Sequence, residues 1–336
     1  MVDATHVSLR ADDRSYFAIL KKEIHLKVAE AGFSSVKGGE IDIIVSELTS
    51  NLSKHATGGE ILFGHVAGPE TEYIEVIAID NGPGMGDPRK MLMDGVSTTQ
   101  TLGHGLGSIR RLSDDFDIFS QIGWGTIVLS RVYRRRPSPQ KNTGFELRKL
   151  VVAKPGEKVS GDGSYYKVND DYLKILVADG LGHGPEANRA VNEAVSAFKS
   201  CPFNDPVEII KYLHTSIRKT RGIVGTVIIY DFNRKCWSIG GVGNISSKLV
   251  NYMALRNYIP YNGIIGHNIA NSMKTQEYSQ SEFAQIIACS DGLKSRWDTS
   301  RLPTIGRHDL SVLNAALYKD FARKTDDMTV VSCKVQ

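Results

Sequence analysis

Short apolar segments with an acidic residue at one end recur in the second half of this chain. Residues 173–178, Leu-Lys-Ile-Leu-Val-Ala, are typical of a buried strand, and Asp179-Gly180 follows them at once. A glycine in that place lets the backbone turn sharply and leaves room for a ligand. The acids in comparable positions are Asp162, Asp179, Asp291 and the adjacent pair Asp326-Asp327. Carboxylates repeated in this way favour a metal cluster over a series of unrelated solvated turns.

The composition restricts the class of protein. With 336 residues the chain is long enough for two domains, and a formal charge of +4 is too small to indicate nucleic-acid binding. No apolar run approaches the ~20 residues of a membrane helix, and the N-terminus does not have the pattern of a signal peptide. The four cysteines are far apart and fit reduced core thiols. We therefore expect a cytoplasmic protein that has neither nucleic-acid nor membrane partners.

A break in the pattern divides the chain. Residues 134–142, Arg-Arg-Arg-Pro-Ser-Pro-Gln-Lys-Asn, show neither an apolar period nor strand character, and this predicts a linker. The expected division is a domain over 1–134, a basic linker over 135–144 and a second domain over 145–336. Helical and strand periods alternate on both sides, so the predicted class is α/β (α+β) with two domains.

A helix predicted over residues 39–56 carries polar groups that packing alone does not require. Glu47 and Asn51 are four residues apart and share one face, opposite Leu48 and Leu52. The pattern fits an amphipathic helix with a solvated face. It also fits a helix that presents a carboxylate and an amide to a Mg²⁺-bound phosphate.

Two glycine-rich motifs follow within residues 80–107, a stretch long enough to indicate a ligand-binding loop. The sequence Asp80-Asn81-Gly82-Pro83-Gly84 places a carboxylate at a strand end, where it could accept a hydrogen bond from an adenine amino group. Residues 101–108 enter a helix through glycines whose amides can bind phosphate. Each motif is weak alone, but the helix and the two motifs in this order are specific.

These three motifs resemble the N, G1 and G2 boxes of the GHKL ATPases, and residues 1–134 are most similar to RsbT-like switch kinases and anti-sigma-factor kinases. The resemblance implies an α/β sandwich that phosphorylates serine or threonine on STAS-domain proteins, with ATP and Mg²⁺ as cofactors. Glu47 would be the catalytic base, Asn51 the Mg²⁺ ligand and Asp80 the adenine-binding residue. The other ATP-binding residues implied are Gly82, Gly84, Thr101, Gly103, Gly105, Gly107 and Thr126.

The acidic motifs of the second half resemble, in their order, those of the metal-dependent serine/threonine phosphatases. The similarity is to the RsbX-like branch of the SpoIIE-type enzymes over residues 145–336, and it implies an αββα sandwich with two Mn²⁺ or Mg²⁺ ions. Asp179 would bridge both metals and carry catalysis. The implied metal ligands are Asp162, Asp179, the carbonyl of Gly180, Asp291 and Asp326. Spacing does not separate Asp326 from Asp327, although the motif favours Asp326; His183 fits a loop residue better than a proton donor.

Together the resemblances predict a bifunctional regulator that phosphorylates and dephosphorylates STAS-type proteins in a bacterial stressosome or anti-sigma partner-switching pathway. The alternative is a phosphatase whose ATP-binding domain is a nucleotide-gated partner-binding module without kinase activity. The sequence leaves both open. It also leaves open a homodimer, which the related anti-sigma-factor kinases form.

Overall fold

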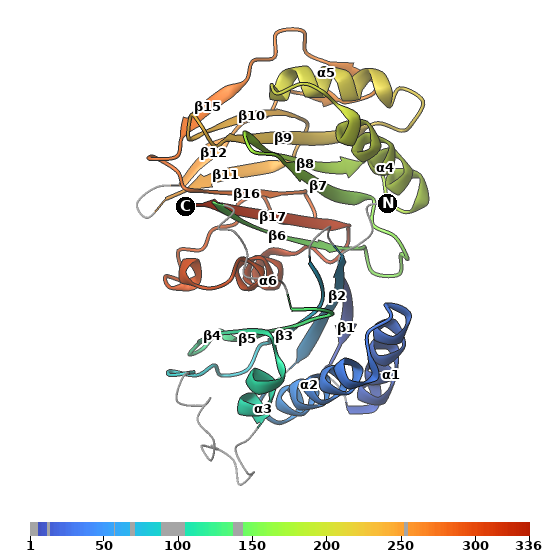
Figure 1. The fold of residues 1–336 in the computed structure, drawn as a ribbon, viewed down its shortest axis with the longest axis vertical. Coiled ribbons are helices and arrows are strands. Elements are labelled where there is room, and N and C mark those ends of the chain that lie inside the picture. The colour runs from blue at the N-terminus through green and yellow to red at the C-terminus, as the bar shows by residue number, and fades with distance from the viewer. Residues whose placement is uncertain are drawn as a thin grey trace. The chain divides into compact units, whose positions relative to one another are not determined.

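The structure, a computed structural model, forms two compact units that are not contiguous in sequence (Figure 1). The N-terminal unit comprises residues 5–141 and 298–319, and the C-terminal unit comprises residues 1–4, 142–297 and 320–336. The residues described are 6–11, 14–56, 58–67, 71–88, 105–136, 144–251 and 255–336.

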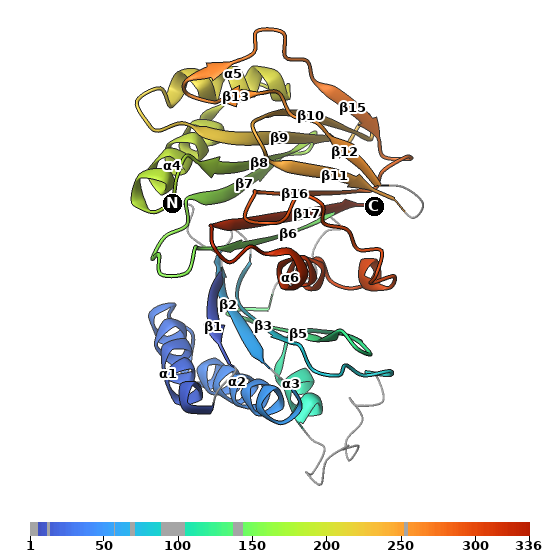
Figure 2. The ribbon, with the colours of Figure 1, turned by 180° about the vertical axis from the view of Figure 1, so that it is seen from behind.

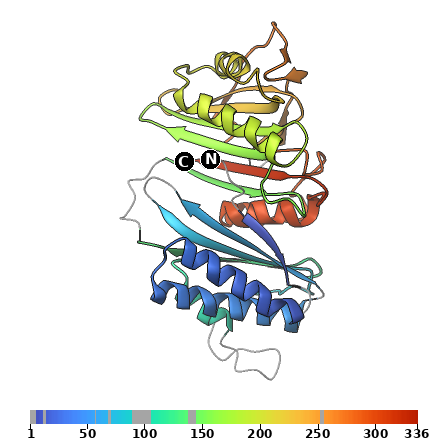
Figure 3. The ribbon, with the colours of Figure 1, turned by 90° about the vertical axis from the view of Figure 1, so that its right-hand side faces the viewer.

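The N-terminal unit contains an antiparallel sheet with three helices on one face (Figures 1 and 3). Its strand order, among the described residues, is β1-β2-β3-β5-β4. The elements are β1 (His6–Arg10), α1 (Arg14–Glu30), α2 (Ser35–His55), β2 (Gly59–Ala67), β3 (Glu72–Asp80), α3 (Gly105–Leu112), β4 (Asp115–Gln121) and β5 (Gly125–Tyr133).

Helix α2 forms because its apolar residues recur at helical spacing and are buried against the sheet. Its buried apolar residues are Ile41, Ile44, Val45, Leu48 and Leu52. Ser34 caps the helix, since its side chain accepts a hydrogen bond from the amide of Lys37. On the facing strand β3, Ile74, Val76 and Ala78 alternate toward the same core. This packing holds the polar face of α2 in a fixed orientation.

The second stretch of the N-terminal unit comes from the far end of the chain. Residues 298–319 include η2 (Ile305–Arg307) and most of α6 (Leu310–Phe321), which lies on the sheet face opposite α1 and α2 (Figure 3). The sequence-based division assigns this segment to the C-terminal domain. The structure differs because His308, Asp309 and Ser311 of the segment have partners in β4, β5 and β3, as in the Asp309–Arg131 ion pair. Residues 137–143 of the predicted linker lie outside the described residues.

The C-terminal unit contains two antiparallel sheets, with α4 (Pro185–Ser200) and α5 (Pro206–Ser216) outside the first (Figure 2). The first sheet has the order β15-β10-β9-β8-β7, built from β7 (Asp162–Val168), β8 (Tyr172–Gly180), β9 (Ile223–Asp231), β10 (Cys236–Val242) and β15 (Gln276–Ser279). The second has the order β12-β11-β16-β17-β6, built from β6 (Phe145–Val152), β11 (Ser246–Val250), β12 (Leu255–Tyr258), β16 (Gln285–Cys289) and β17 (Met328–Val335). A short ribbon joins β13 (Gly263–Ile264) to β14 (Asn268–Ile269).

Strand β8 is buried on both faces, which explains its nearly continuous apolar sequence. Leu173, Ile175 and Val177 point into the core between the two sheets. Leu176 and Ala178 point into the core beneath α4 and α5. The strand then ends at Asp179-Gly180, so that a rigid element carries the carboxylate. Within the described residues, no helix combines the length and apolar character needed to cross a membrane.

Candidate functional site

The first candidate site lies where α2 meets the start of α3. Glu47 and Asn51 share one face of α2, and Gly105 opens α3 directly against them. A Cβ atom on Gly105 would lie 2.9 Å from Glu47 Oε2 and 3.5 Å from Asn51 Oδ1. Glycine is therefore required for this approach, and the structure brings together three of the predicted ATP-site residues. Gly107 is buried two residues further along the same helix, whereas Thr101 and Gly103 lie outside the described residues.

Asp80 ends strand β3 with its carboxylate held from two sides. Oδ1 accepts hydrogen bonds from the amide of Gly82 at 2.7 Å and from the amide of Thr126 at 3.1 Å. Burial raises the pKa of Asp80 above its ordinary value, and the two amides and the charge of Lys319 act in the opposite direction. The predicted residues Asp80, Gly82 and Thr126 thus form one group.

Gly82 and Gly84 let the segment after β3 pack closely against the ends of α2 and β4. Gly84 has a φ of +72°, and a Cβ there would lie 1.9 Å from the carbonyl oxygen of Gln121. A Cβ on Gly82 would lie 2.6 Å from the carbonyl oxygen of His55, at the end of α2. The close approach of Gly82 to His55 connects the Asp80 group to α2, the helix that carries Glu47 and Asn51.

The second candidate site lies in the C-terminal unit, where β7 and β8 pair. Asp162 and Asp179 are directly opposite in the antiparallel register. Asp162 is only 2% exposed and accepts a 2.5 Å hydrogen bond from the hydroxyl of Ser290. The same hydroxyl accepts a hydrogen bond from the amide of Thr329 at 2.9 Å. Ser290 therefore orients Asp162. The motifs alone indicate no role for Ser290, although its place directly before Asp291-Gly292 is a signal.

Repulsion among carboxylates dominates the electrostatics of this site. Burial, together with the charges of Asp291 and Asp326, raises the pKa of Asp179 to about 7. Burial and the charge of Asp179 likewise raise the pKa of Asp162, and burial and Asp326 raise that of Asp291. Bound divalent cations would remove this repulsion, and the carboxylate oxygens present are the donors that Mg²⁺ and Mn²⁺ prefer.

The carboxylates do not form a ready-made metal cage. In the part of the chain that the structure describes, no group of three or more His, Cys, Asp or Glu side chains is arranged to hold a metal ion. The donor chemistry of these carboxylates fits divalent metals.

The two adjacent acids of the last motif have different environments. Asp327 is buried, and its two oxygens accept hydrogen bonds from the amides of Lys154 at 2.8 Å and Gly161 at 2.9 Å. Asp326 is half-buried and interacts electrostatically with Asp291 and Asp179. Asp327 therefore fixes the turn before Asp162, a role that spacing did not reveal.

Three more residues singled out in the sequence surround this site. Gly180 donates its amide to the carbonyl of Gly161 at 3.0 Å, and a Cβ on Gly180 would lie 2.4 Å from the carbonyl oxygen of Ala187. Gly292 is as tightly constrained, since a Cβ there would lie 1.9 Å from the carbonyl oxygen of Asp327. The imidazole of His183 is exposed and pairs with Glu157 at 2.8 Å.

Comparison with known proteins identifies the N-terminal part. The histidine kinase-like ATPase domain matches residues 14–130. The serine/threonine-protein kinase RsbT of Bacillus subtilis (strain 168) is 40% identical over 99 residues, which are 74% of RsbT and 30% of this chain. The chain belongs to the histidine kinase-like ATPase family. The residues described around Glu47, Asp80 and Thr126 lie inside this family match.

The C-terminal part is similar to a phosphatase. The phosphoserine phosphatase RsbX of Bacillus subtilis (strain 168) is 26% identical over 196 residues, which are 96% of RsbX and 57% of this chain. A crystal structure of RsbX in complex with magnesium superposes with a TM-score of 0.52 at 20% identity, covering 59% of this chain and 98% of RsbX. A structure described as "The bacterial stressosome: a modular system that has been adapted to control secondary messenger signaling" matches with a TM-score of 0.52 at 26% identity, covering 56% of this chain and 99% of its own.

The comparisons confirm the predicted family resemblances and the predicted α/β class. An RsbT-like histidine kinase-like ATPase part precedes an RsbX-like part with the phosphatase fold in a single chain.

Proposed function

We propose that this protein is a bifunctional regulator that phosphorylates and dephosphorylates STAS-type proteins in a bacterial partner-switching circuit. The observation that carries the proposal is the joining of an RsbT-like and an RsbX-like part in one chain. RsbT is a serine/threonine-protein kinase and RsbX a phosphoserine phosphatase, so the product of one reaction belongs to the substrate class of the other. The similarity to a structure described with the bacterial stressosome supports the choice of circuit.

In the N-terminal unit, Glu47 accepts the proton of the attacking serine or threonine hydroxyl as the γ-phosphoryl group is transferred. Asn51 would hold the Mg²⁺ that accompanies ATP. Asp80 accepts a hydrogen bond from the adenine amino group through Oδ2, since its backbone hydrogen bonds from Gly82 and Thr126 both go to Oδ1. The glycines of the G1 and G2 motifs, Gly82, Gly84, Gly103, Gly105 and Gly107, with Thr101, line the nucleotide. Positioning and charge neutralisation then supply most of the rate.

In the C-terminal unit, Asp162, Asp179, the carbonyl of Gly180, Asp291 and Asp326 would hold two Mg²⁺ or Mn²⁺ ions. When bound, such ions supply a water-derived nucleophile at neutral pH and neutralise the charge of the phosphate. Ser290 keeps Asp162 in its orientation, and Asp327 keeps the turn at Gly161 in place. Water adds to the phosphorus of phosphoserine or phosphothreonine, the ester P–O bond breaks, and the serine or threonine oxygen leaves with a proton taken from solvent.

The kinase claim is tested with γ-labelled ATP and a STAS-domain protein. Wild type should transfer label, and Glu47→Ala should reduce the rate about 100-fold or more, since a positioned general base contributes roughly 10²–10⁴-fold. The control Glu30→Ala, at the exposed end of α1, should leave the rate unchanged. Transfer that is absent from wild type, or unchanged in Glu47→Ala, would refute the kinase.

The phosphatase claim is tested by phosphate release from the phosphorylated STAS protein. Asp179→Asn should abolish release, and Asp170→Asn, on an exposed turn before β8, should not. If release depends on Asp179 while no label is transferred from ATP, the N-terminal unit is a nucleotide-gated binding module. That second candidate is favoured by one observation, the presence of Lys319 from the phosphatase half beside Asp80-Asn81.

A further inference from the structure

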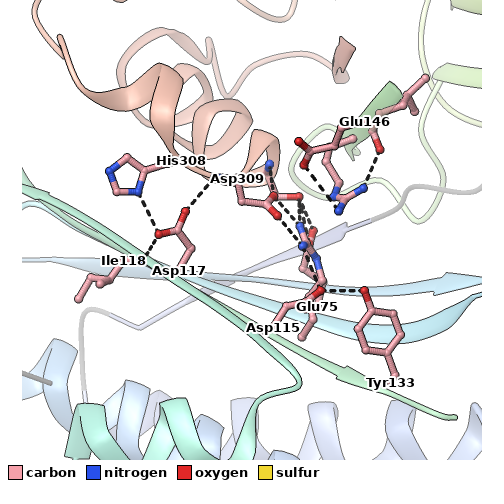
Figure 4. Close-up of polar contacts among 12 residues, drawn as sticks. Glu75, Asp115, Asp117, Ile118, Tyr133, Glu146, His308 and Asp309 are labelled. Carbon is pink, nitrogen blue, oxygen red and sulfur yellow. Dashed lines mark hydrogen bonds and ion pairs between the residues drawn. The ribbon is translucent and has the colours of Figure 1, made fainter. Parts of the chain in front are cut away.

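A buried ion-pair network fixes residues 298–319 in the N-terminal unit. Arg131 of β5 is 1% exposed, and its guanidinium donates to both carboxylate oxygens of Asp309 at 2.7 Å. The same side chain donates to the hydroxyl of Ser311 at 2.8 Å and to Glu75 of β3 at 2.5 Å. In Figure 4, Asp309 faces the strands that carry Glu75 and Asp117. A buried arginine with two carboxylate partners makes this attachment specific.

Further contacts hold the segment on both sides of this network. The carboxylate of Asp117 accepts the amide of Asp309 at 2.8 Å and lies 2.9 Å from Nδ1 of His308 (Figure 4). Near the other end of α6, the hydroxyl of Tyr318 donates to Glu60 of β2. The segment is therefore an integral part of the ATP-binding unit, although it follows most of the phosphatase sequence in the chain.

Lys319 connects this segment to the nucleotide site. Its ammonium group donates to Oδ1 of Asn81 at 2.7 Å and to the carbonyl of Trp124 at 3.0 Å, and it lies 4.4 Å from the centre of the Trp124 ring. Asn81 directly follows Asp80, and Trp124 lies two residues before Thr126, whose amide reaches the Asp80 carboxylate. One lysine thus holds both segments that position Asp80.

The same helix leads into the metal-site loop of the C-terminal unit. Helix α6 ends at Phe321, two residues after Lys319, which is about 3 Å along a helix axis. The carbonyl of Phe321 accepts the amide of Lys294, and the amide of Arg323 donates to the carbonyl of Gly292 at 2.8 Å. These pairs fix the chain that directly follows Asp291. Asp326 lies three residues beyond Arg323 in sequence.

We propose that Lys319 of the 298–319 segment is a positioning residue of the nucleotide site, and that α6 makes phosphatase activity depend on adenine nucleotide. The inference rests on the proposed function, since it takes Asp80 as an adenine ligand and Asp291 as a metal ligand. A nucleotide bound to Asp80 favours one position of Asn81 and Trp124, and hence of Lys319. Neighbouring residues of one helix move together. A bound nucleotide that favours one position of Lys319 therefore also favours one position of Phe321 and of the loop at Gly292. The coupling is reciprocal, and metal binding must change nucleotide affinity by the same factor.

The test uses the full chain with fluorescent ADP for nucleotide affinity and p-nitrophenyl phosphate with Mn²⁺ for phosphatase rate. In wild type, saturating ADP should change phosphatase kcat/KM about fivefold or more, within the usual range of coupling between sites. Lys319→Met should weaken ADP binding about tenfold and remove the response to ADP, measured as the ratio of the phosphatase rates with and without ADP. Lys319→Arg should restore part of the ADP affinity and part of the response to ADP. The control Lys22→Met, at an exposed position of α1, should match wild type in both measurements.

The outcomes separate this inference from the proposed function. ADP binding and phosphatase activity in wild type without any response to ADP would overturn the inference and leave the two activities standing. A phosphatase rate in Lys319→Met that responds to ADP as wild type does would also overturn the inference and leave the two activities standing. A wild type that binds no ADP, or does not hydrolyse the ester with Mn²⁺, would overturn both. Loss of the response in Lys319→Met with recovery in Lys319→Arg supports the role of the charge over a merely structural one.

Discussion

Replacing Asp309 should destabilise the N-terminal unit, although the residue belongs to the phosphatase half of the sequence. In Asp309→Ala, the buried guanidinium of Arg131 loses two 2.7 Å hydrogen bonds and keeps Glu75 and Ser311 as partners. Removing one member of a buried ion pair reduces the free energy of unfolding by about 3–5 kcal/mol. Because Glu75 remains, we expect the lower end, about 3 kcal/mol, which lowers Tm by roughly 6–12 °C for a unit of this size.

Thermal unfolding followed by hydrogen exchange with mass spectrometry measures this effect and locates it. The amides of β3 and β5 should lose protection in Asp309→Ala, since these strands carry Glu75 and Arg131. Asp170→Ala, which removes an exposed carboxylate, serves as the control. A Tm change below about 2 °C, or faster exchange confined to residues 145–297, would refute the assignment of the segment to the N-terminal unit.

Two further predictions concern the acidic site. The raised pKa of Asp179, about 7, means that the metal-free native state holds a proton that the unfolded chain releases near pH 4, so its stability falls as the pH rises between these values. In EDTA, Tm should therefore decrease from pH 5 to pH 7.5, and the decrease should be smaller in Asp179→Asn; an identical pH profile in the variant would contradict the repulsion described. Ser290→Ala should weaken Mn²⁺ binding about 10-fold or more, measured by calorimetry, because Asp162 loses its orienting hydroxyl; unchanged affinity would show that Ser290 does not orient a ligand.

Local periodicity predicted the elements that carry the candidate sites. The helix expected over 39–56 is α2, Ser35–His55, and the apolar run 173–178 is the core of β8, Tyr172–Gly180. Both have long, strongly patterned sequences whose buried faces are formed by near neighbours in the fold. The pairing of β7 with β8 then places Asp162 opposite Asp179, as two acids of one predicted site.

The attachment of residues 298–319 was not predictable in the same way. Glu75 and Arg131 interrupt apolar strands, and charged residues in such positions are typical of a solvated face. In the structure, however, Glu75 is only 2% exposed and Arg131 only 1%. What buries them includes Asp309, 178 residues from Arg131 in sequence, and no local pattern reports a contact at that separation. The different environments of Asp326 and Asp327 also depend on backbone amides of distant residues, since those of Lys154 and Gly161 donate to Asp327.

If one chain adds and removes the same phosphate, both reactions should be visible in a single mixture. The quantity to measure is the steady-state phosphorylated fraction of a STAS-domain protein, incubated with ATP, Mg²⁺ and Mn²⁺ and each form of this protein. We expect an intermediate fraction with continuing ATP consumption for wild type, nearly complete phosphorylation for Asp179→Asn and none for Glu47→Ala. A fraction in Asp179→Asn that equals the wild-type fraction, or no phosphorylation in Asp179→Asn, would contradict the bifunctional proposal.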